Sequence, residues 1–211
     1  MFINLFTNLL FWILYISFIN KILQNRPSNL IISNNLVSLT HALLTICGSS
    51  YILYNNDNND NSISIKLINF SASYFIYDCL FMLLNNFSLV FFLHHIIILG
   101  FYCITLTYDY GYKLVILSLF WGEITNPLQI TWFLSRVLNY KKIEHYIFPI
   151  FSFNFIIIRT AVLPIIHYTM ISSLFKTTDY YYPTIGLSIL TILGTLGGLI
   201  WSTKIMKKLV G

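Results

Sequence analysis

Residues 74–95, YFIYDCLFMLLNNFSLVFFLHH, decide the fold of this chain. Two apolar runs meet at the polar pair Asn85-Asn86; the first carries Asp78 and the second carries His94-His95. A charged side chain at the centre of a bilayer costs about 2.5–3.5 kcal/mol on insertion scales, so such residues usually pair with one another or serve a function. The stretch therefore predicts two membrane helices joined by a tight turn, with a polar site between them.

The composition of the whole chain agrees with a membrane location. Of its 211 residues, 57% are hydrophobic and only 9% are charged, and the mean hydropathy is +0.74. A soluble domain carries about 25% charged residues. The sequence is therefore that of a polytopic membrane protein, and its length suits one compact helix bundle.

Seven apolar stretches approach the roughly 20 residues that cross a bilayer. We expect helices over residues 2–23, 30–54, 65–84, 87–107, 112–134, 147–171 and 183–206. We expect loops over residues 55–64, 136–146 and 172–182. Pro127 and Pro164 are expected to kink the fifth and sixth helices. The predicted fold class is an all-α polytopic bundle of about seven transmembrane helices, within a range of five to eight.

The basic residues predict the orientation of this bundle. The side that receives the loop after the first helix carries eight of them: Lys21, Arg26, Arg136, Lys141, Lys142, Lys204, Lys207 and Lys208. The opposite side carries three: Lys66, Lys113 and Lys176. The positive-inside rule makes the first side cytosolic, with the N-terminus lumenal or outside and the C-terminus cytosolic. The net charge of +5 is scattered through short loops without interleaved aromatics, which argues against a nucleic-acid partner.

The predicted topology brings ionisable side chains to similar depths in the membrane. Asp78 lies six residues before the end of its helix and His94 lies seven residues into the next, so both are roughly 10 Å below the cytosolic interface. His41, Glu123 and Arg159 each lie roughly 17 Å deep. Such groups must face inward. They form either a functional lipid cavity with a polar layer or a buried hydrogen-bonded network that fixes helix packing.

The His-carboxylate combination predicts a catalytic role for His94, His95 and Asp78. A carboxylate in a low-dielectric site orients an imidazole and stabilises the imidazolium, which suits a general base or a nucleophile. Adjacent helical residues point about 100° apart, so one histidine faces the site and the other contacts a neighbour. Neither the histidines nor the three cysteines show metal-ligand spacing, so we expect no metal; a metal-dependent membrane oxidase stays a minor alternative.

A series of short motifs resembles the TLC domain family over roughly residues 30–206. These motifs are Ser38-x-x-His41, Tyr74-Phe75-Ile76-x-Asp78, His94-His95, Glu123-x-Thr125-x-Pro127, Trp132-Phe133-Leu134, and Arg159 ahead of Pro164. The variant is most similar to the TLC domain-containing protein 4 type, with ceramide synthases as distant relatives. This resemblance divides the chain into an N-terminal helix and linker (1–29), the TLC domain (30–206) and a short basic tail (207–211).

The resemblance implies a protein of the endoplasmic reticulum or another endomembrane that acts on lipids. Its partners would be membrane lipids and fatty acyl chains, and acyl-CoA is a candidate substrate with no cofactor. In ceramide synthases the histidine pair lies in a longer motif with further aspartates, whereas residues 121–127 here contain Glu123 as their one acid. Two functions therefore follow: acyl transfer through a buried His/Asp site, or non-enzymatic lipid sensing or trafficking.

Overall fold

The computed structural model describes residues 2–24, 29–55, 61–85, 88–176 and 180–210. Its helices are α1 (Phe2–Ile22), α2 (Asn29–Tyr54), α3 (Ser62–Leu84), α4 (Leu89–Tyr108), α5 (Tyr112–Glu123), α6 (Asn126–Val137), α7 (Lys141–Ile157), the π-helical turn η1 (Ile158–Val162), α8 (Leu163–Leu174) and α9 (Tyr181–Val210). Each predicted membrane helix thus has a counterpart. Asn86 of the predicted Asn85-Asn86 turn and residues 56–60 of the expected 55–64 loop lie outside the described residues, whereas residues 62–64 of that loop belong to α3.

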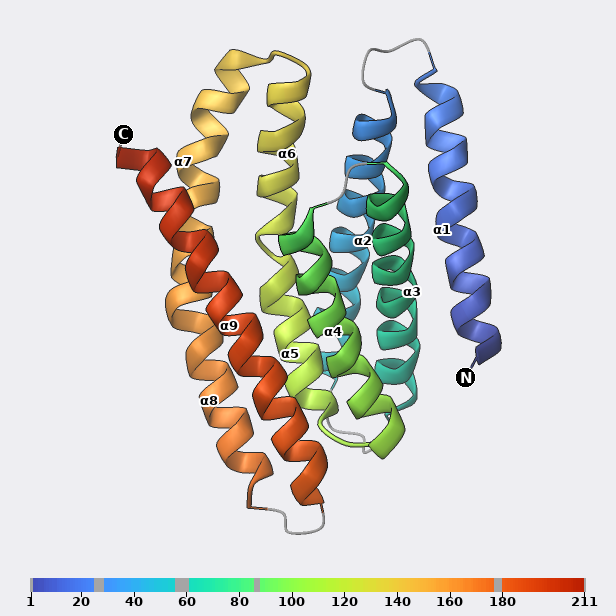
Figure 1. Ribbon diagram of the computed structural model, residues 1–211, viewed down its shortest axis with the longest axis vertical. Coiled ribbons are helices and arrows are strands. Elements are labelled where there is room, and N and C mark those ends of the chain that lie inside the picture. The colour runs from blue at the N-terminus through green and yellow to red at the C-terminus, as the bar shows by residue number, and fades with distance from the viewer. Residues whose placement is uncertain (1, 25–28, 56–60, 86–87, 177–179, 211) are drawn as a thin grey trace.

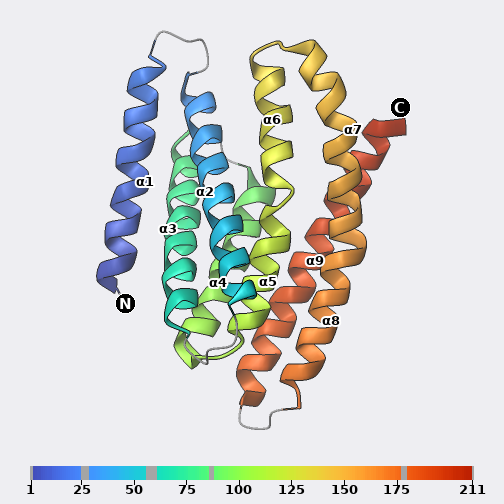
Figure 2. The same cartoon turned by 180° about the vertical axis from the view of Figure 1, so that it is seen from behind.

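These elements form seven antiparallel crossings of one bundle (Figure 1). Six continuous helical stretches within the described residues are long and apolar enough to cross a membrane. The remaining crossing is divided between α5 and α6, which have 12 residues each. Figure 2 shows from behind that α1 lies at one edge, beside α2 and α3, and that α7, α8 and α9 form the other edge. The predicted all-α polytopic fold is confirmed.

Two crossings depart from a regular α-helix just before the prolines at which kinks were expected. Pro127 lies in the first turn of α6, and Ile124 and Thr125 separate this helix from α5. Pro164 lies in the first turn of α8, directly after η1. Proline has no backbone N–H and its ring clashes with the preceding turn, so a regular helix is interrupted there. These two interruptions lie midway along the fifth and sixth crossings.

The expected loop over residues 136–146 is wrong for most of its length. Helix α7 already begins at Lys141. Glu144 in its first turn lies 3.4 Å from both the Arg136 Nε and the Lys141 Nζ. Helix α7 therefore begins within this charged segment, several residues before the apolar stretch. Helix α9 likewise runs to Val210, beyond the predicted end at residue 206.

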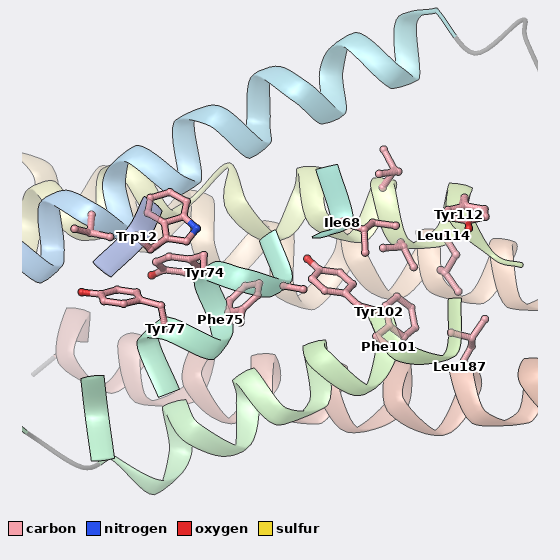
Figure 3. Packing of buried hydrophobic residues seen from close by; sticks show 14 of the residues in the cluster. Trp12, Ile68, Tyr74, Phe75, Tyr77, Phe101, Tyr102, Tyr112, Leu114 and Leu187 are labelled. Carbon is pink, nitrogen blue, oxygen red and sulfur yellow. The ribbon is translucent and has the colours of Figure 1, made fainter. Parts of the chain in front are cut away.

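An aromatic cluster joins α1 to the rest of the bundle. Trp12 is fully buried, and its indole N–H donates to the Ser73 hydroxyl at 3.2 Å. Its ring centroid lies 5.5 Å from that of Tyr74. Figure 3 shows these two rings above Phe75 and Tyr77, with Tyr102 further along the same layer. The N-terminal helix therefore shares one hydrophobic core with the other helices.

Candidate functional site

An elongated cavity of about 420 Å³ lies inside the bundle. Five of the six predicted site residues line it: Asp78, His94, His95, Glu123 and Arg159. The volume is in the range of small-molecule sites, about 300–1,000 Å³. Five side chains from four separate crossings thus line one internal space, and the sixth predicted residue, His41, does not.

The cavity extends along most of α4, from Ser88 to Tyr102. At 1.5 Å per residue this interval spans roughly 20 Å. One leaflet of the hydrocarbon core is roughly 15 Å thick, so the cavity is long enough for one acyl chain. Apolar side chains such as Ile98, Phe101 and Leu119 make up a large part of the remaining wall. The space therefore combines ionisable and other polar groups with a mainly hydrocarbon-like lining.

Asp78 and His95 form the closest acid-base contact on the cavity wall. The His95 Nδ1 lies 3.5 Å from the Asp78 Oδ2, beyond the usual 2.7–3.2 Å of an N–H···O hydrogen bond. The other oxygen, Oδ1, accepts from the Asn34 amide at 3.1 Å. Tyr77 in turn donates to the Asn34 amide oxygen at 2.8 Å. Asn34 therefore orients the carboxylate, and α3 and α4 place it opposite His95.

His94 also lines the cavity but has a different neighbour. Its ring centroid lies 5.3 Å from that of Trp201 on α9, in an edge-to-face arrangement. The two histidine rings are 5.8 Å apart and tilted by 48°. The helical rotation thus gives the carboxylate contact to His95 and an aromatic contact to His94.

Glu123 and His41 form a second pair, deeper in the bundle. The His41 Nδ1 lies 3.9 Å from the Glu123 Oε2, which also accepts from Asn126 at 2.7 Å. His41 is almost fully buried, contacts the Ser71 hydroxyl at 2.9 Å and stacks on Tyr74 with centroids 3.8 Å apart. Glu123 reaches the cavity, whereas His41 lies behind Tyr74 and does not line it.

Arg159 enters the cavity from the π-helical turn η1. Its Nη2 donates to the Gly122 carbonyl at 2.9 Å, which joins the sixth crossing to the break in the fifth. Its guanidinium carbon lies 5.2 Å from the ring centre of Phe155. Its side chain also passes close to Gly198, where a Cβ would lie 3.4 Å from the arginine Cδ. Small residues on two neighbouring helices therefore make room for this side chain.

Several polar residues that the sequence analysis did not single out complete the site. Asn34 and Asn126 each hold one carboxylate. At the far end of the cavity, His167 contacts Ser118 and Thr195, at 3.1 Å each. His167 thus has a partner for both ring nitrogens, as expected for a satisfied polar residue. Serine, threonine and asparagine are common in membrane helices, so no pattern in the sequence marked these as partners.

The part of the chain that the structure describes offers no metal site. Within the described residues, no group of three or more His, Cys, Asp or Glu side chains is arranged to hold a metal ion. The metal-dependent oxidase alternative therefore has no candidate ligand set in this part of the chain.

Comparison with known proteins identifies the family. A family model described as the TLC domain matches residues 31–207, which is most of the chain. The chain belongs to the TLC domain family. The matched TLC domain contains every residue of the cavity wall described above. The matched range agrees with the resemblance expected over residues 30–206. Membership of this family makes the chain a multi-pass membrane protein with a link to lipids. No curated protein and no solved structure gives a match.

Proposed function

We propose that this TLC domain protein holds one lipid acyl chain in its central cavity and transfers the acyl group from acyl-CoA to an acceptor. The observation that carries the proposal is the Asp78–His95 contact of 3.5 Å on the wall of an otherwise mainly apolar cavity. A chain in the apolar section would place its carbonyl carbon near this pair. His95 is then the general base, Asp78 its orienting carboxylate, and His94 an adjoining wall residue.

The reaction would need one proton acceptor and no cofactor. The His95 Nε2 takes a proton from the hydroxyl or amine of the acceptor while the oxygen or nitrogen of the acceptor attacks the thioester carbonyl. The new bond to the acceptor forms and the C–S bond breaks. The imidazolium, stabilised by Asp78, returns the proton to the leaving thiolate. The products are the acylated acceptor and free CoA thiol, so atoms and charge balance.

The segment around Glu123 differs from the corresponding motif of ceramide synthases, and this difference bears on the acceptor. Residues 121–127 contain Glu123 as their one acid, where ceramide synthases, which the sequence resembles only distantly, have further aspartates. Glu123 is held by Asn126 and approaches His41, so its carboxyl group already has protein partners. We infer an acceptor other than a sphingoid base, in keeping with the resemblance to the TLC domain-containing protein 4 type.

We further propose that the end of the bundle where α1 and α6 end and α2 and α7 begin faces the cytosol of an endoplasmic reticulum-type membrane. Arg136, Lys141 and the basic residues at the end of α9 lie at this end (Figure 1). Positive charge favours the cytosolic side. The N-terminus would then be lumenal, and the end of the cavity near Ser88 would be nearest to cytosolic acyl-CoA.

An acyltransferase assay on the purified protein tests the catalytic part. The donor is palmitoyl-CoA, the acceptors are a membrane lipid extract, and CoA thiol release is measured. We expect His95→Ala and Asp78→Asn to reduce turnover by roughly 100-fold or more, the scale of general-base catalysis. His145→Ala removes an exposed histidine and should leave turnover unchanged. Turnover that survives His95→Ala would contradict the assignment.

A second function, non-enzymatic lipid sensing or trafficking, is favoured by one feature of the site. The His95 Nδ1 has no hydrogen-bond partner within the described structure, and its 3.5 Å approach to Asp78 is long for catalysis. Under this alternative the cavity binds an acyl chain without turnover. The same protein would then retain bound lipid and release no CoA thiol.

A further inference from the structure

Arg159 is the cavity residue whose hydrogen-bonding capacity is least used. A guanidinium group has five N–H donors. One of them reaches the Gly122 carbonyl, while the buried Nε has no partner in the described part of the chain. An unpaired charged donor in an apolar interior is costly and calls for a ligand or a specific role.

The acidic residues of the cavity already have partners of their own. Asp78 approaches His95 and accepts from Asn34, and Glu123 approaches His41 and accepts from Asn126. Across the described residues, no carboxylate oxygen lies within 4 Å of the Arg159 guanidinium. Arg159 is also the one Lys or Arg among the residues that line the described cavity. Its positive charge interacts with Glu123 only at longer range and with the Phe155 ring, and it makes no direct ion pair within the described residues.

The local backbone explains how the arginine is presented. The π-helical turn η1 inserts an extra residue into the sixth crossing, and such turns occur frequently at functional sites. Gly122 and Gly198 flank the side chain: their Cβ atoms, if present, would lie 3.9 Å from Nη1 and 3.4 Å from Cδ. The guanidinium is thus held between two helices by its stem and by one hydrogen bond, and its other donors have no hydrogen-bond partner among the described residues.

We propose that Arg159 makes the cavity a receptor for a long-chain fatty acid, bound as its carboxylate. This inference rests on the proposed acyl-chain cavity and names the head group that the cavity prefers. Guanidinium and carboxylate match in shape and form charge-assisted, often bidentate, hydrogen bonds. One guanidinium neutralises one negative charge, and two acidic side chains also face the cavity, so a carboxylate fits better than a phosphate with up to two charges. The fatty acid carries the same chain as the proposed acyl-CoA donor and would compete with it.

Matched ligands with one chain and different head groups test this proposal. Binding of palmitate, palmityl alcohol and palmityl phosphate is measured on the purified protein at mildly alkaline pH, where the carboxyl group is ionised. The readout is the ratio of palmitate to palmityl alcohol affinity in each variant. We expect the natural protein to favour palmitate by roughly 10- to 100-fold, the value of hydrogen bonds to a charged group.

Two substitutions assign this preference to Arg159. In Arg159→Gln the ratio should fall close to one while palmityl alcohol still binds, which also shows that the cavity is intact. Arg136→Gln removes the same charge outside the cavity and should keep the natural ratio. Should Arg159→Gln fail to fold, Arg159→Lys keeps the charge but loses the planar fork, and its ratio should fall below that of the natural protein while staying above one.

The outcomes separate this inference from the proposed function. An unchanged ratio in Arg159→Gln, or in Arg159→Lys if only that variant folds, would overturn the role of Arg159. Tighter binding of palmityl phosphate than of palmitate would overturn the carboxylate assignment. Binding of none of the three ligands would instead contradict the acyl-chain cavity itself.

Discussion

Filling the cavity from α9 should weaken ligand binding without damaging the fold. Gly194 lines the cavity, and a Cβ added there would meet no heavy atom within 4 Å. Gly194→Leu therefore places a four-carbon side chain in space that is now empty. Gly197→Leu is the matched control, because Gly197 is also open to a Cβ but does not line the cavity.

The size of the effect follows from the displaced part of the ligand. A leucine side chain occupies about the space of four methylene groups, and each buried methylene contributes about 0.8 kcal/mol relative to water. The upper limit is then about 3 kcal/mol, or roughly 200-fold in affinity. In detergent or lipid the loss is smaller, since the surroundings are themselves apolar, and we expect roughly 10-fold.

Palmitate binding and thermal unfolding are measured on both variants in the same detergent. Each substitution replaces a helical glycine, which favours the helix by up to about 1 kcal/mol, so neither protein should unfold earlier than the natural one. Gly194→Leu should lose affinity and Gly197→Leu should not. Equal palmitate affinity in the two variants would refute the conclusion that this cavity holds the acyl chain.

Two further predictions concern the fold. Gly111 has φ +80° and a Cβ there would lie 2.8 Å from the buried Leu187, so Gly111→Ala should destabilise the protein by about 1–2 kcal/mol in a thermal melt. Gly197→Ala should do the opposite, and a stabilised Gly111→Ala would contradict the strain. Ser73→Ala removes the acceptor of the buried Trp12 indole N–H and should cost about 1 kcal/mol, measured by chemical unfolding in detergent. An unchanged unfolding midpoint would show that this bond does not hold α1 in place.

Much of the architecture was predictable because the membrane restricts the choices. A spanning segment must be helical and apolar, so helix number and approximate position follow from the sequence. The prolines at 127 and 164 also gave the positions of the two interruptions. The start of α7 was not predictable, since Lys141 and Glu144 read as loop residues until their ion pairs are seen. The form of the second interruption, a π-helical turn, has no sequence signature.

The sequence allowed us to predict how deep the ionisable side chains lie in the membrane, but not which of them contact each other. Equal depth brought Asp78 close to the histidine pair, and the structure shows that His95 makes the contact. The rotation of α2 about its own axis could not be inferred, so His41 was expected in the cavity wall rather than behind Tyr74. The role of Asn34 depends on the same rotation.

Photocrosslinking with a fatty acid that carries a diazirine near its methyl end tests most directly whether the acyl chain lies inside the bundle. After irradiation and digestion, mass spectrometry locates the labelled residues. We expect labels on cavity residues such as Ile98 and Leu119, and their loss in Gly194→Leu. Labels confined to exposed residues of α9 such as Leu193 and Ile200, and unchanged in Gly194→Leu, would contradict an internal acyl-chain site.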